Sequence, residues 1–320
     1  MNRGSFLFRE EPHDVIARIF SRSLGVEGGV SARLLDGGMF NTTYLVEYGA
    51  PPQRAVLRLG PVERQRLLGF ERGLMRAEER VCAVCRSLDL PCSRVLAVDC
   101  SRALVDRDYM IVDYIPSVPM CDAGLGRGEK ERLYHELGRW LRRLHSVRGE
   151  GFGFVSRQLE GLSFPRWSEA LSFEIADFTA RLESAGGLTA AEGARVRGIY
   201  AQNAALFDEI SEPRLLHTDI WEGNVLLDGE THAILAVIDG DRAIFGDPDF
   251  EFASPWGQVP PLREGYGFEP VRDGHRERRM RLYLAFYLAL EAHVGLSEYN
   301  NPGLFRDRKR QLFEVLGTFA

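Results

Sequence analysis

The chain has 320 residues, of which 45% are hydrophobic and 27% charged, as in a soluble globular enzyme with one large domain or two lobes. The longest apolar run begins at Met280 and is too short and too interrupted to span a bilayer. No apolar stretch follows the opening MNRGSFLFREEPH, so we find no secretory signal and expect a cytoplasmic location.

The net charge of −6 is unevenly distributed along the chain. Residues 1–115 carry 16 basic and 15 acidic side chains, whereas residues 116–320 carry 24 basic and 31 acidic ones. The acidic second half disfavours nucleic acid and would suit a cationic small molecule, although solubility alone explains it equally well. Nothing in the sequence indicates a membrane or protein partner.

The first half of the chain has mainly strand-like patterns. A glycine pair joins two strand-like runs in residues 31–49, and PQRAVLRLG supplies a third strand. A helical pattern follows over residues 64–89, and then come two further strands, RVLAVDC and DYMIVDYI. Pro116 breaks the pattern, so residues 113–117 are a candidate connector.

Helical patterns dominate the second half, over residues 130–147, 168–183, 189–208 and 275–294. A short passage, NVLLDGETHAILAVID, interrupts them and has the pattern of a β-hairpin. We therefore predict an α+β fold with two lobes, a strand-rich lobe at residues 1–115 and a helix-rich lobe at residues 116–320. A functional cleft would lie between them.

Five cysteines lie within forty residues, at Cys82, Cys85, Cys92, Cys100 and Cys121. The first two form a CxxC pair, which could indicate zinc. However, this pair lies in a helical pattern and no second pair with ligand spacing follows it. We expect reduced thiols that fill the core.

The most informative stretch is HTDIWEGN, residues 217–224, together with the predicted hairpin that follows it. On a helix, Asp219 and Asn224 would lie about 140° apart, and the intervening Trp and Gly favour a loop. Antiparallel pairing of NVLLD with AILAVID would bring Asn224 beside Asp239. Three oxygen-bearing side chains at one loop edge suit Mg²⁺ with bound phosphate. The alternative is a solvated hairpin with incidental acids.

HTDIWEGN followed by VID resembles the HxDxxxxN loop and downstream metal-binding Asp of the aminoglycoside phosphotransferase-like small-molecule kinases, which have a protein-kinase-like fold. The resemblance extends from about residue 30 to the last helices. It implies ATP as cofactor, Asp219 as catalytic base, and Asn224 and Asp239 as Mg²⁺ ligands. It also implies that His217 shapes the loop by hydrogen bonding.

A kinase-like first lobe needs a cation on its third strand. The chain's two lysines, Lys130 and Lys309, lie outside this lobe, so the candidate is Arg58 in AVLRL. Many members of the small-molecule kinase family resemble this chain in using arginine here. An arginine binds phosphate as a planar fork and a lysine as a point charge, so details of protein-kinase ATP geometry do not transfer.

The partner of this cation follows from helical periodicity. Glu78 is the single carboxylate on an otherwise apolar stripe, which comprises Leu74, Glu78, Val81, Cys85 and Leu88. A buried, unpaired carboxylate is costly, and a pair with Arg58 would remove that cost. Glu71 lies on the same face one heptad earlier and is the alternative partner.

Two further segments gain a role from the resemblance. DGGMFNTTYLV, with Gly37 and Gly38, is similar to the family's short glycine loop, which would place Gly38 and Asn41 at the phosphates; the alternative is a plain hairpin turn. DYMIVDYIP corresponds to the connector between the lobes. The resemblance implies that the Asp113 carbonyl and the Ile115 amide bind adenine.

The acids of IDGDRAIFGDPDFEF leave two interpretations open. Asp241, Asp247, Asp249 and Glu251 are either helix caps and surface charge or part of a site for an amine-bearing acceptor. The family usually has an aromatic residue where Gly240 stands and an Asp where Glu251 stands, so acceptor contacts do not transfer.

These patterns together predict an ATP-dependent O-phosphotransferase. The expected acceptor is a small molecule with a hydroxyl group, first an aminoglycoside or another antibiotic. A metabolic kinase for an amino-alcohol or a sugar is the close alternative, because family membership does not determine the acceptor. From another class, a nucleotide-binding pseudokinase that regulates a partner is also considered.

Overall fold

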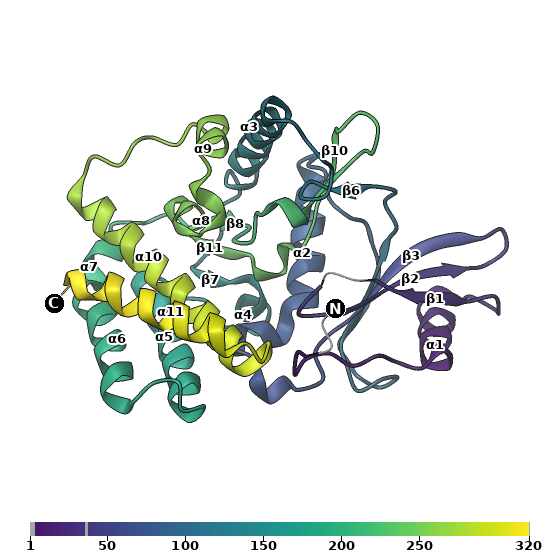
Figure 1. Ribbon diagram of the computed structural model, residues 1–320, viewed down its shortest axis with the longest axis horizontal. Helices are drawn as coiled ribbons and strands as arrows, with labels where there is room; N and C mark the ends of the chain where they lie inside the picture. Colours follow the sequence, from purple (N-terminus) through teal and green to yellow (C-terminus); the bar gives the residue numbers. More distant parts are fainter. Residues whose placement is uncertain (1–3, 36–37, 320) are drawn as a thin grey trace.

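The computed structural model describes residues 4–35 and 38–319, with a strand-rich N-terminal part and a helix-rich C-terminal part (Figure 1). This arrangement confirms the predicted α+β fold. The helices are α1 (His13–Leu24), α2 (Leu74–Ser87), α3 (Arg127–Leu144), α4 (Val155–Leu159), α5 (Trp167–Ser184), α6 (Ala190–Gln202), α7 (Ala204–Phe207), α8 (Pro248–Ala253), α9 (Pro260–Tyr266), α10 (Gly274–His293) and α11 (Pro302–Leu316). The strands are β1 (Ser31–Leu34), β2 (Thr42–Tyr48), β3 (Gln53–Leu59), β4 (Val95–Asp99), β5 (Tyr109–Asp113), β6 (Val118–Pro119), β7 (Gly153–Phe154), β8 (Arg214–Leu216), β9 (Val225–Leu227), β10 (Ile234–Val237) and β11 (Ile244–Gly246).

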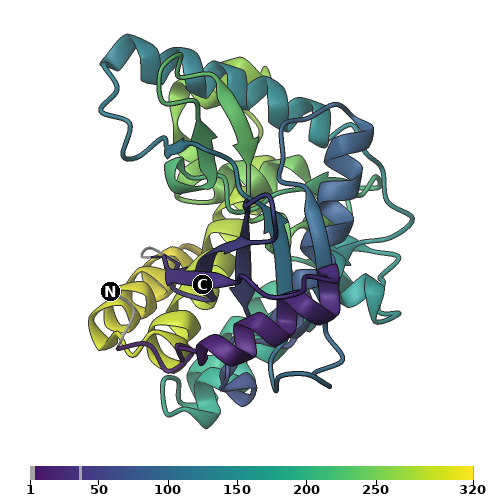
Figure 2. The same cartoon turned by 90° about the vertical axis from the view of Figure 1, so that its right-hand side faces the viewer.

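The N-terminal part is built on a five-stranded sheet in the order β1-β2-β3-β5-β4, with antiparallel neighbours throughout. Its two faces are covered by different helices. Ile16, Ile19 and Phe20 of α1 pack against one face, and Figure 2 shows this helix lying across the strands. Met75 of α2 packs on the other face, against Met110 of β5.

Alternation along β3 determines where Arg58 points. Leu57 and Leu59 belong to the cluster beneath α1, whereas Val56 packs with Met75 of α2. Because successive side chains of a strand point to opposite faces, Arg58 shares the face of Val56. The strand pattern therefore directs this guanidinium toward α2.

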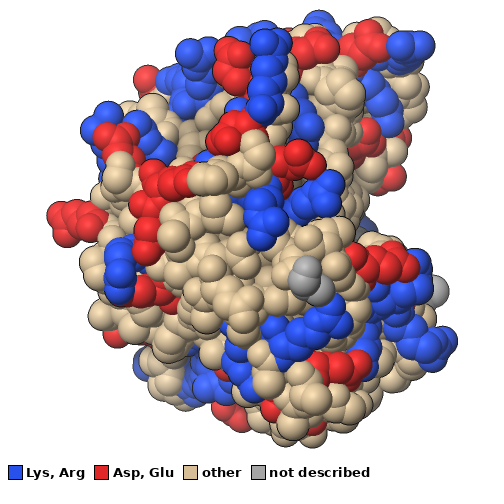
Figure 3. All heavy atoms as spheres, turned by 90° about the vertical axis from the view of Figure 1, so that its left-hand side faces the viewer, with Lys and Arg blue, Asp and Glu red and all other residues tan. Residues whose placement is uncertain are grey.

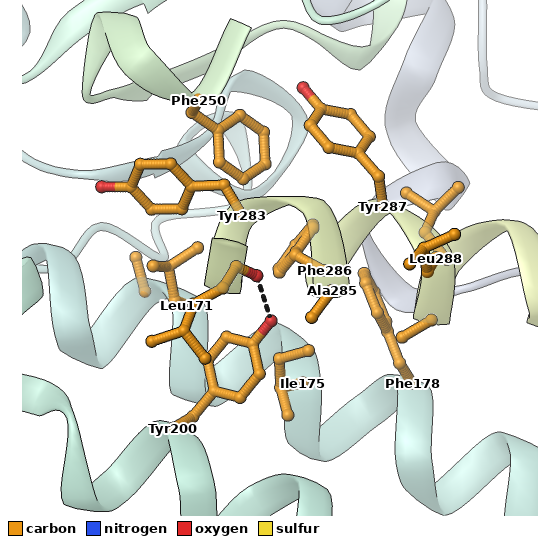
Figure 4. Close-up of a cluster of buried hydrophobic side chains, with 14 of the residues drawn as sticks. Leu171, Ile175, Phe178, Tyr200, Phe250, Tyr283, Ala285, Phe286, Tyr287 and Leu288 are labelled. Carbon is orange, nitrogen blue, oxygen red and sulfur yellow. Dashed lines mark hydrogen bonds between the residues drawn. The ribbon is translucent and has the colours of Figure 1, made fainter. Parts of the chain in front are cut away.

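The C-terminal part has its own aromatic core. Phe178 of α5, Tyr200 of α6 and Phe286 of α10 belong to one buried cluster (Figure 4). The Tyr200 hydroxyl donates to the Leu282 carbonyl at 2.7 Å, so its polar end is satisfied inside this core. The cluster anchors α10, whose other residues extend toward the site described below.

Two small sheets connect these helices. One has the order β10-β9-β6 and contains the predicted hairpin, in which Val225 pairs with Val237. The other has the order β7-β11-β8. Strand β6 follows the predicted connector and pairs with β9, so the chain joins the C-terminal part directly after leaving the five-stranded sheet.

Some predicted elements differ from the observed ones. The prediction of a continuous helix over residues 64–89 was wrong for the first ten residues. Two short 3₁₀ turns lie there, before the start of α2. Gly69 and Gly73 bound the second turn, and the low helix propensity of glycine explains the late start. The helix predicted over 189–208 is interrupted at Asn203, and α1 was not predicted.

Within the described ranges we find no helix with the length and hydropathy needed to cross a membrane. Figure 3 views the helical side of the molecule and shows basic and acidic side chains interspersed. All five cysteines are free thiols. Cys82 and Cys85 are buried as expected, but Cys121 is exposed, so the prediction that the thiols fill the core was wrong for this residue.

Candidate active site

The loop between β8 and β9 carries the HTDIWEGN sequence and is held in an unusual backbone conformation. Thr218 has φ 70°, in the left-handed region that β-branched residues rarely occupy. Its amide donates to both carboxylate oxygens of Glu251, at 2.9 and 3.1 Å, and its hydroxyl donates to the Arg242 carbonyl at 2.8 Å. The surrounding contacts hold the strained residue in place, as is typical of functional loops.

Glu251 of α8 anchors this loop from below. Its carboxylate also accepts the His217 amide at 2.7 Å and lies 3.4 Å from the His145 ring. Burial raises the pKa of Glu251, but the hydrogen bonds and charges around it, from His145 first, outweigh burial and leave the pKa below its ordinary value. The carboxylate is therefore ionised and accepts hydrogen bonds from the backbone of the loop.

His217 is buried inside the same loop, and burial lowers its pKa. Its Nδ1 atom accepts the Asp219 amide at 3.3 Å, which bends the chain tightly between the two residues. A neutral ring with Nδ1 as acceptor is consistent with both observations. His217 therefore contacts the backbone of the loop.

Asp219 and Asn224 are joined across the loop. The Asn224 side-chain nitrogen donates to the Asp219 carbonyl at 2.8 Å and to its carboxylate at 3.1 Å. Burial raises the pKa of Asp219 to about 6, while the positive charge of Arg242 lowers it and the negative charge of Asp239 raises it. A carboxylate with this pKa accepts a proton readily near neutral pH.

Asp239 is brought to Asn224 by the β-hairpin, because the Ile238 amide donates to the Asn224 carbonyl at 2.9 Å. Asp239 itself has φ 60°, a left-handed conformation that turns the chain directly after β10. Its side chain is 33% exposed.

The residues present fit a magnesium ion. Among the described residues, no group of three or more His, Cys, Asp or Glu side chains could hold a metal. Mg²⁺ needs fewer, because it keeps waters and takes one or two protein oxygens together with phosphate oxygens. The side-chain nitrogen of Asn224 donates to Asp219, so the side-chain oxygen of Asn224 takes no part in those two bonds and could bind the ion. Asp239 supplies a carboxylate.

Arg58 links the sheet, α2 and the hairpin. One of its terminal nitrogens lies 2.5 Å from the Glu78 carboxylate, and the other lies 2.7 Å from Asp239 and 3.8 Å from Asp241. Burial lowers the pKa of Arg58, but the negative charges of these three acids raise it by more than burial lowers it. The guanidinium therefore stays charged. Glu78 is thus the partner predicted from helical periodicity. The alternative partner, Glu71, instead binds Arg242 at 2.8 Å.

A cavity of about 510 Å³ lies at these residues, although neither His217 nor Glu78 is among its lining side chains. The sequence-predicted residues along its walls are Gly38, Asn41, Arg58, Asp219, Asn224 and Asp239. Asp113 and Ile115 are not among the lining residues. They lie at the end of β5, where the Asp113 side chain accepts the Arg94 amide at 2.7 Å and the Ile115 carbonyl accepts the Ser117 hydroxyl at 2.9 Å. Gly37 lies outside the described residues.

Most of the acids that follow Asp239 have structural partners. Asp247 caps α8 and pairs with Arg279 at 3.0 Å, and Asp249 pairs with Arg276 at 2.7 Å. Of the interpretation as helix caps and surface charge, these contacts support the cap at Asp247, but surface charge was wrong because all four acids are buried. Asp241 is the one of the four that lines the cavity.

Gly240 allows α2 to approach the hairpin closely. A Cβ atom added at Gly240 would lie 2.9 Å from Cγ1 of Val81 on α2 and 3.7 Å from the His217 ring. No side chain fits there without movement of these neighbours. The departure from the family's aromatic residue at this position therefore has a steric reason in this chain.

The sequence profile of the phosphotransferase enzyme family matches residues 31–292, which is most of the chain. The chain belongs to this family. The match confirms the predicted family and the prediction of a phosphotransferase that acts on hydroxyl groups. A search of curated proteins found no match.

Solved structures resemble this phosphotransferase over nearly its whole length. A candidate fructosamine-3-kinase from Thermobifida fusca YX-ER1 is 21% identical, with 95% of this chain and 100% of that chain covered and a TM-score of 0.64. A candidate fructosamine-3-kinase from Haemophilus somnus 129PT is 14% identical, with 94% and 96% covered and a TM-score of 0.67. APH(2″)-IIa, in a ternary complex with streptomycin and ATP, is 18% identical, with 96% and 97% covered and a TM-score of 0.61. These likenesses confirm the predicted kinase-like fold.

One important residue of the site was not predicted. Glu251 was considered only as a cap or an acceptor ligand, whereas in this phosphotransferase it binds two backbone amides of the HTDIWEGN loop. The sequence feature that could have indicated this role is its position twelve residues after Asp239, in a run of closely spaced acids.

Proposed function

We propose that this phosphotransferase transfers the γ-phosphoryl group of ATP to a hydroxyl group of a small molecule. The observation that carries the proposal is the cavity on which Arg58, Asp219, Asn224 and Asp239 all open. A cation, a carboxylate with raised pKa and two oxygen donors for a metal are the groups that phosphoryl transfer requires.

In the proposed complex the nucleotide lies between the five-stranded sheet and the helical part. Gly38 and Asn41 cover the phosphates, Arg58 binds them by its planar fork, and the Asp113 carbonyl and Ile115 amide receive the adenine. This arrangement makes residues 1–115 and 116–320 the proposed lobes. Asn224 and Asp239 would hold Mg²⁺, which neutralises charge on the β- and γ-phosphates when bound.

Asp219 acts on the acceptor in this proposal. The acceptor oxygen forms a bond to the γ-phosphorus, the bond from that phosphorus to the β–γ bridging oxygen breaks, and ADP leaves with the electron pair. The hydroxyl proton passes to Asp219, whose raised pKa suits it to receive a proton at neutral pH. Arg242 lies close enough to favour the ionised form of Asp219 before transfer.

The acceptor is proposed by class. An antibiotic alcohol is the first class, an aminoglycoside among them, since APH(2″)-IIa is a structural neighbour in complex with streptomycin. A sugar derivative is the second, because two neighbours are described as fructosamine-3-kinases. Use of ATP is consistent with the expected cytoplasmic location.

The test is the turnover of an Asp219→Ala variant in a coupled ADP-release assay with MgATP and a panel of alcohols. We expect kcat to fall by about 10²- to 10⁴-fold while the affinity for MgATP is retained. Asp122→Ala, at an exposed position, serves as the matched control. Near-normal turnover of Asp219→Ala would show that this carboxylate is not the base. ATP binding without any transfer would favour the pseudokinase alternative.

A further inference from the structure

Part of the cavity lining is largely apolar and forms a second wall. Its side chains come from α8, α10, the π-helical turn Val294–Glu298 and α11. They are Phe250, Phe286, Tyr287, Leu290, Val294 and Leu304. This wall continues from the aromatic core of the helical part, as Figure 4 shows for Phe250, Phe286 and Tyr287.

Exposed hydrophobic side chains gather at the same cavity. Five large hydrophobic side chains are exposed in the described part of the chain, and three of them, Met39, Trp221 and Trp256, line this cavity. The two tryptophan rings lie 6.4 Å apart, centroid to centroid, at an interplanar angle of 43°. Because they lie side by side, they form one exposed aromatic surface at this cavity. An exposed apolar surface at the mouth of a cavity indicates contact with a ligand.

The charges that line the cavity are nearly all neutralised by one another. Asp239 and Asp241 lie beside Arg58, Arg242 binds Glu71, and Glu291 pairs with Arg308. Among the described lining residues, Asp219 is the one acid without such an ion pair. A polycationic acceptor needs several free carboxylates to replace its lost hydration, and this wall does not offer them.

Tyr287 supplies a polar group in the apolar wall. Its side chain is 7% exposed, and its buried hydroxyl has no hydrogen-bond partner among the described residues. In Figure 4 this hydroxyl points away from the cluster that holds Phe178 and Tyr200. Burial raises the pKa of Tyr287, and so do the negative charges of Glu251, Asp219 and Glu291, so the phenol remains a donor. A buried donor without a partner is costly, and an oxygen of a ligand would satisfy it.

We infer that the acceptor of this enzyme is an alcohol with an apolar face and at most one positive charge. Its reacting hydroxyl faces Asp219, its apolar face packs on Trp221, Trp256 and Phe286, and an oxygen elsewhere on it accepts a hydrogen bond from Tyr287. This inference rests on the proposed phosphotransfer function and narrows its acceptor. Among antibiotic alcohols, it favours apolar ones as acceptors and disfavours the polycationic aminoglycosides.

The test compares four alcohols with the full-length enzyme and MgATP. Chloramphenicol is a neutral aromatic diol and erythromycin an apolar ring with one amine, whereas kanamycin A is a polycation and choline a small cation. We expect kcat/KM for at least one of the first two to exceed that for kanamycin A by tenfold or more. Transfer to kanamycin A or choline without transfer to either apolar alcohol would overturn the inference and leave the proposed function intact. No ADP release with any of the four alcohols would also overturn the inference. Alcohol-dependent ADP release that Asp219→Ala leaves unchanged would overturn the proposed function.

Two variants test the wall itself. Tyr287→Phe removes one hydroxyl and should raise KM for the apolar alcohol about three- to tenfold, with KM for ATP unchanged. Trp256→Ala should also raise this KM while leaving kcat little changed. Tyr48→Phe, whose hydroxyl binds Gln53 at 3.2 Å in the N-terminal sheet, and Phe173→Ala, an exposed aromatic outside the cavity, are the matched controls. Unchanged KM in both wall variants would overturn the assignment of this surface to the acceptor.

Discussion

Two arginine clusters in this molecule use the same chemistry for different purposes. Arg58 lies at the cavity, between buried Glu78 and the partly exposed Asp239. Arg279 lies within the helical part, where it pairs with Asp247 at 3.0 Å, and Tyr283 donates to the same carboxylate at 2.9 Å. In the first cluster one acid opens on the cavity, whereas in the second both Asp247 and Arg279 are buried.

The difference in exposure indicates which cluster can change its partners. An ion pair with one member in contact with a cavity can exchange that partner for a ligand, at little cost to the fold. A pair enclosed on all sides must stay intact, because removal of one member leaves the other charge buried. We therefore expect substitutions in the cluster around Arg279 to affect stability. Substitutions at Asp239, the partly exposed partner of Arg58, should affect activity.

The largest expected effect is on stability. Asp247→Ala should lower the free energy of unfolding by about 2–3 kcal/mol, since it removes the N-cap of α8 and leaves the buried Tyr283 hydroxyl without its acceptor. The Arg279 guanidinium keeps Glu209 as a partner at 2.7 Å. Urea denaturation measures this loss, with Asp122→Ala as the exposed control. Turnover per folded molecule should match that of the unsubstituted enzyme at low temperature. A loss below about 1 kcal/mol would mean that this cluster behaves as a surface pair.

Asp239→Asn should have the opposite profile. Loss of this carboxylate removes a proposed metal ligand, and we expect kcat/KM to fall on the order of 10²- to 10³-fold. The free energy of unfolding should change by about 1 kcal/mol or less, because the Asp239 side chain is 33% exposed. Coupled ADP release and urea denaturation together measure both quantities. If stability fell as far as in Asp247→Ala, the proposed contrast between the clusters would be wrong.

The smallest effect concerns pH. The pKa of Asp219 is raised to about 6, and the proposed base must be deprotonated to accept the hydroxyl proton. The kcat/KM value should therefore rise about tenfold per pH unit below pH 6 and level off above it. The profile of Asp219→Asn should lack this limb. A limb centred near pH 4 would instead indicate a carboxylate with an ordinary pKa, outside the buried loop.

Local patterns predicted much of this architecture because they depend on neighbours in sequence. Strand alternation and helical period brought Arg58 to Glu78, and turn residues predicted the hairpin that ends at Asp239. The contact of Glu251 with the His217 and Thr218 amides joins residues 34 and 33 positions apart, and no periodicity reports such a pairing. The helix α1 was not predicted, although it packs against one face of the sheet.

The apolar wall was also beyond the reach of local patterns. Trp221 and Trp256 come from separate segments and meet only in the folded chain. Tyr287 lies in α10, which is apolar around much of its circumference. The sequence pattern therefore does not indicate which residue of this helix brings a hydroxyl group to the cavity. The roles of Asp219 and Asp239 in catalysis stay proposals that the variants above test.

Gly240 allows the two halves of the enzyme to approach each other closely. With hydrogen as its side chain, α2 rests on the turn after Asp239 through Val81, and Glu78 lies one helical turn before that contact. A larger residue would act as a wedge there, pushing α2 outward and drawing Glu78 away from Arg58. The tolerance of this one position to added volume thus reports how tightly the halves must close for the enzyme to work.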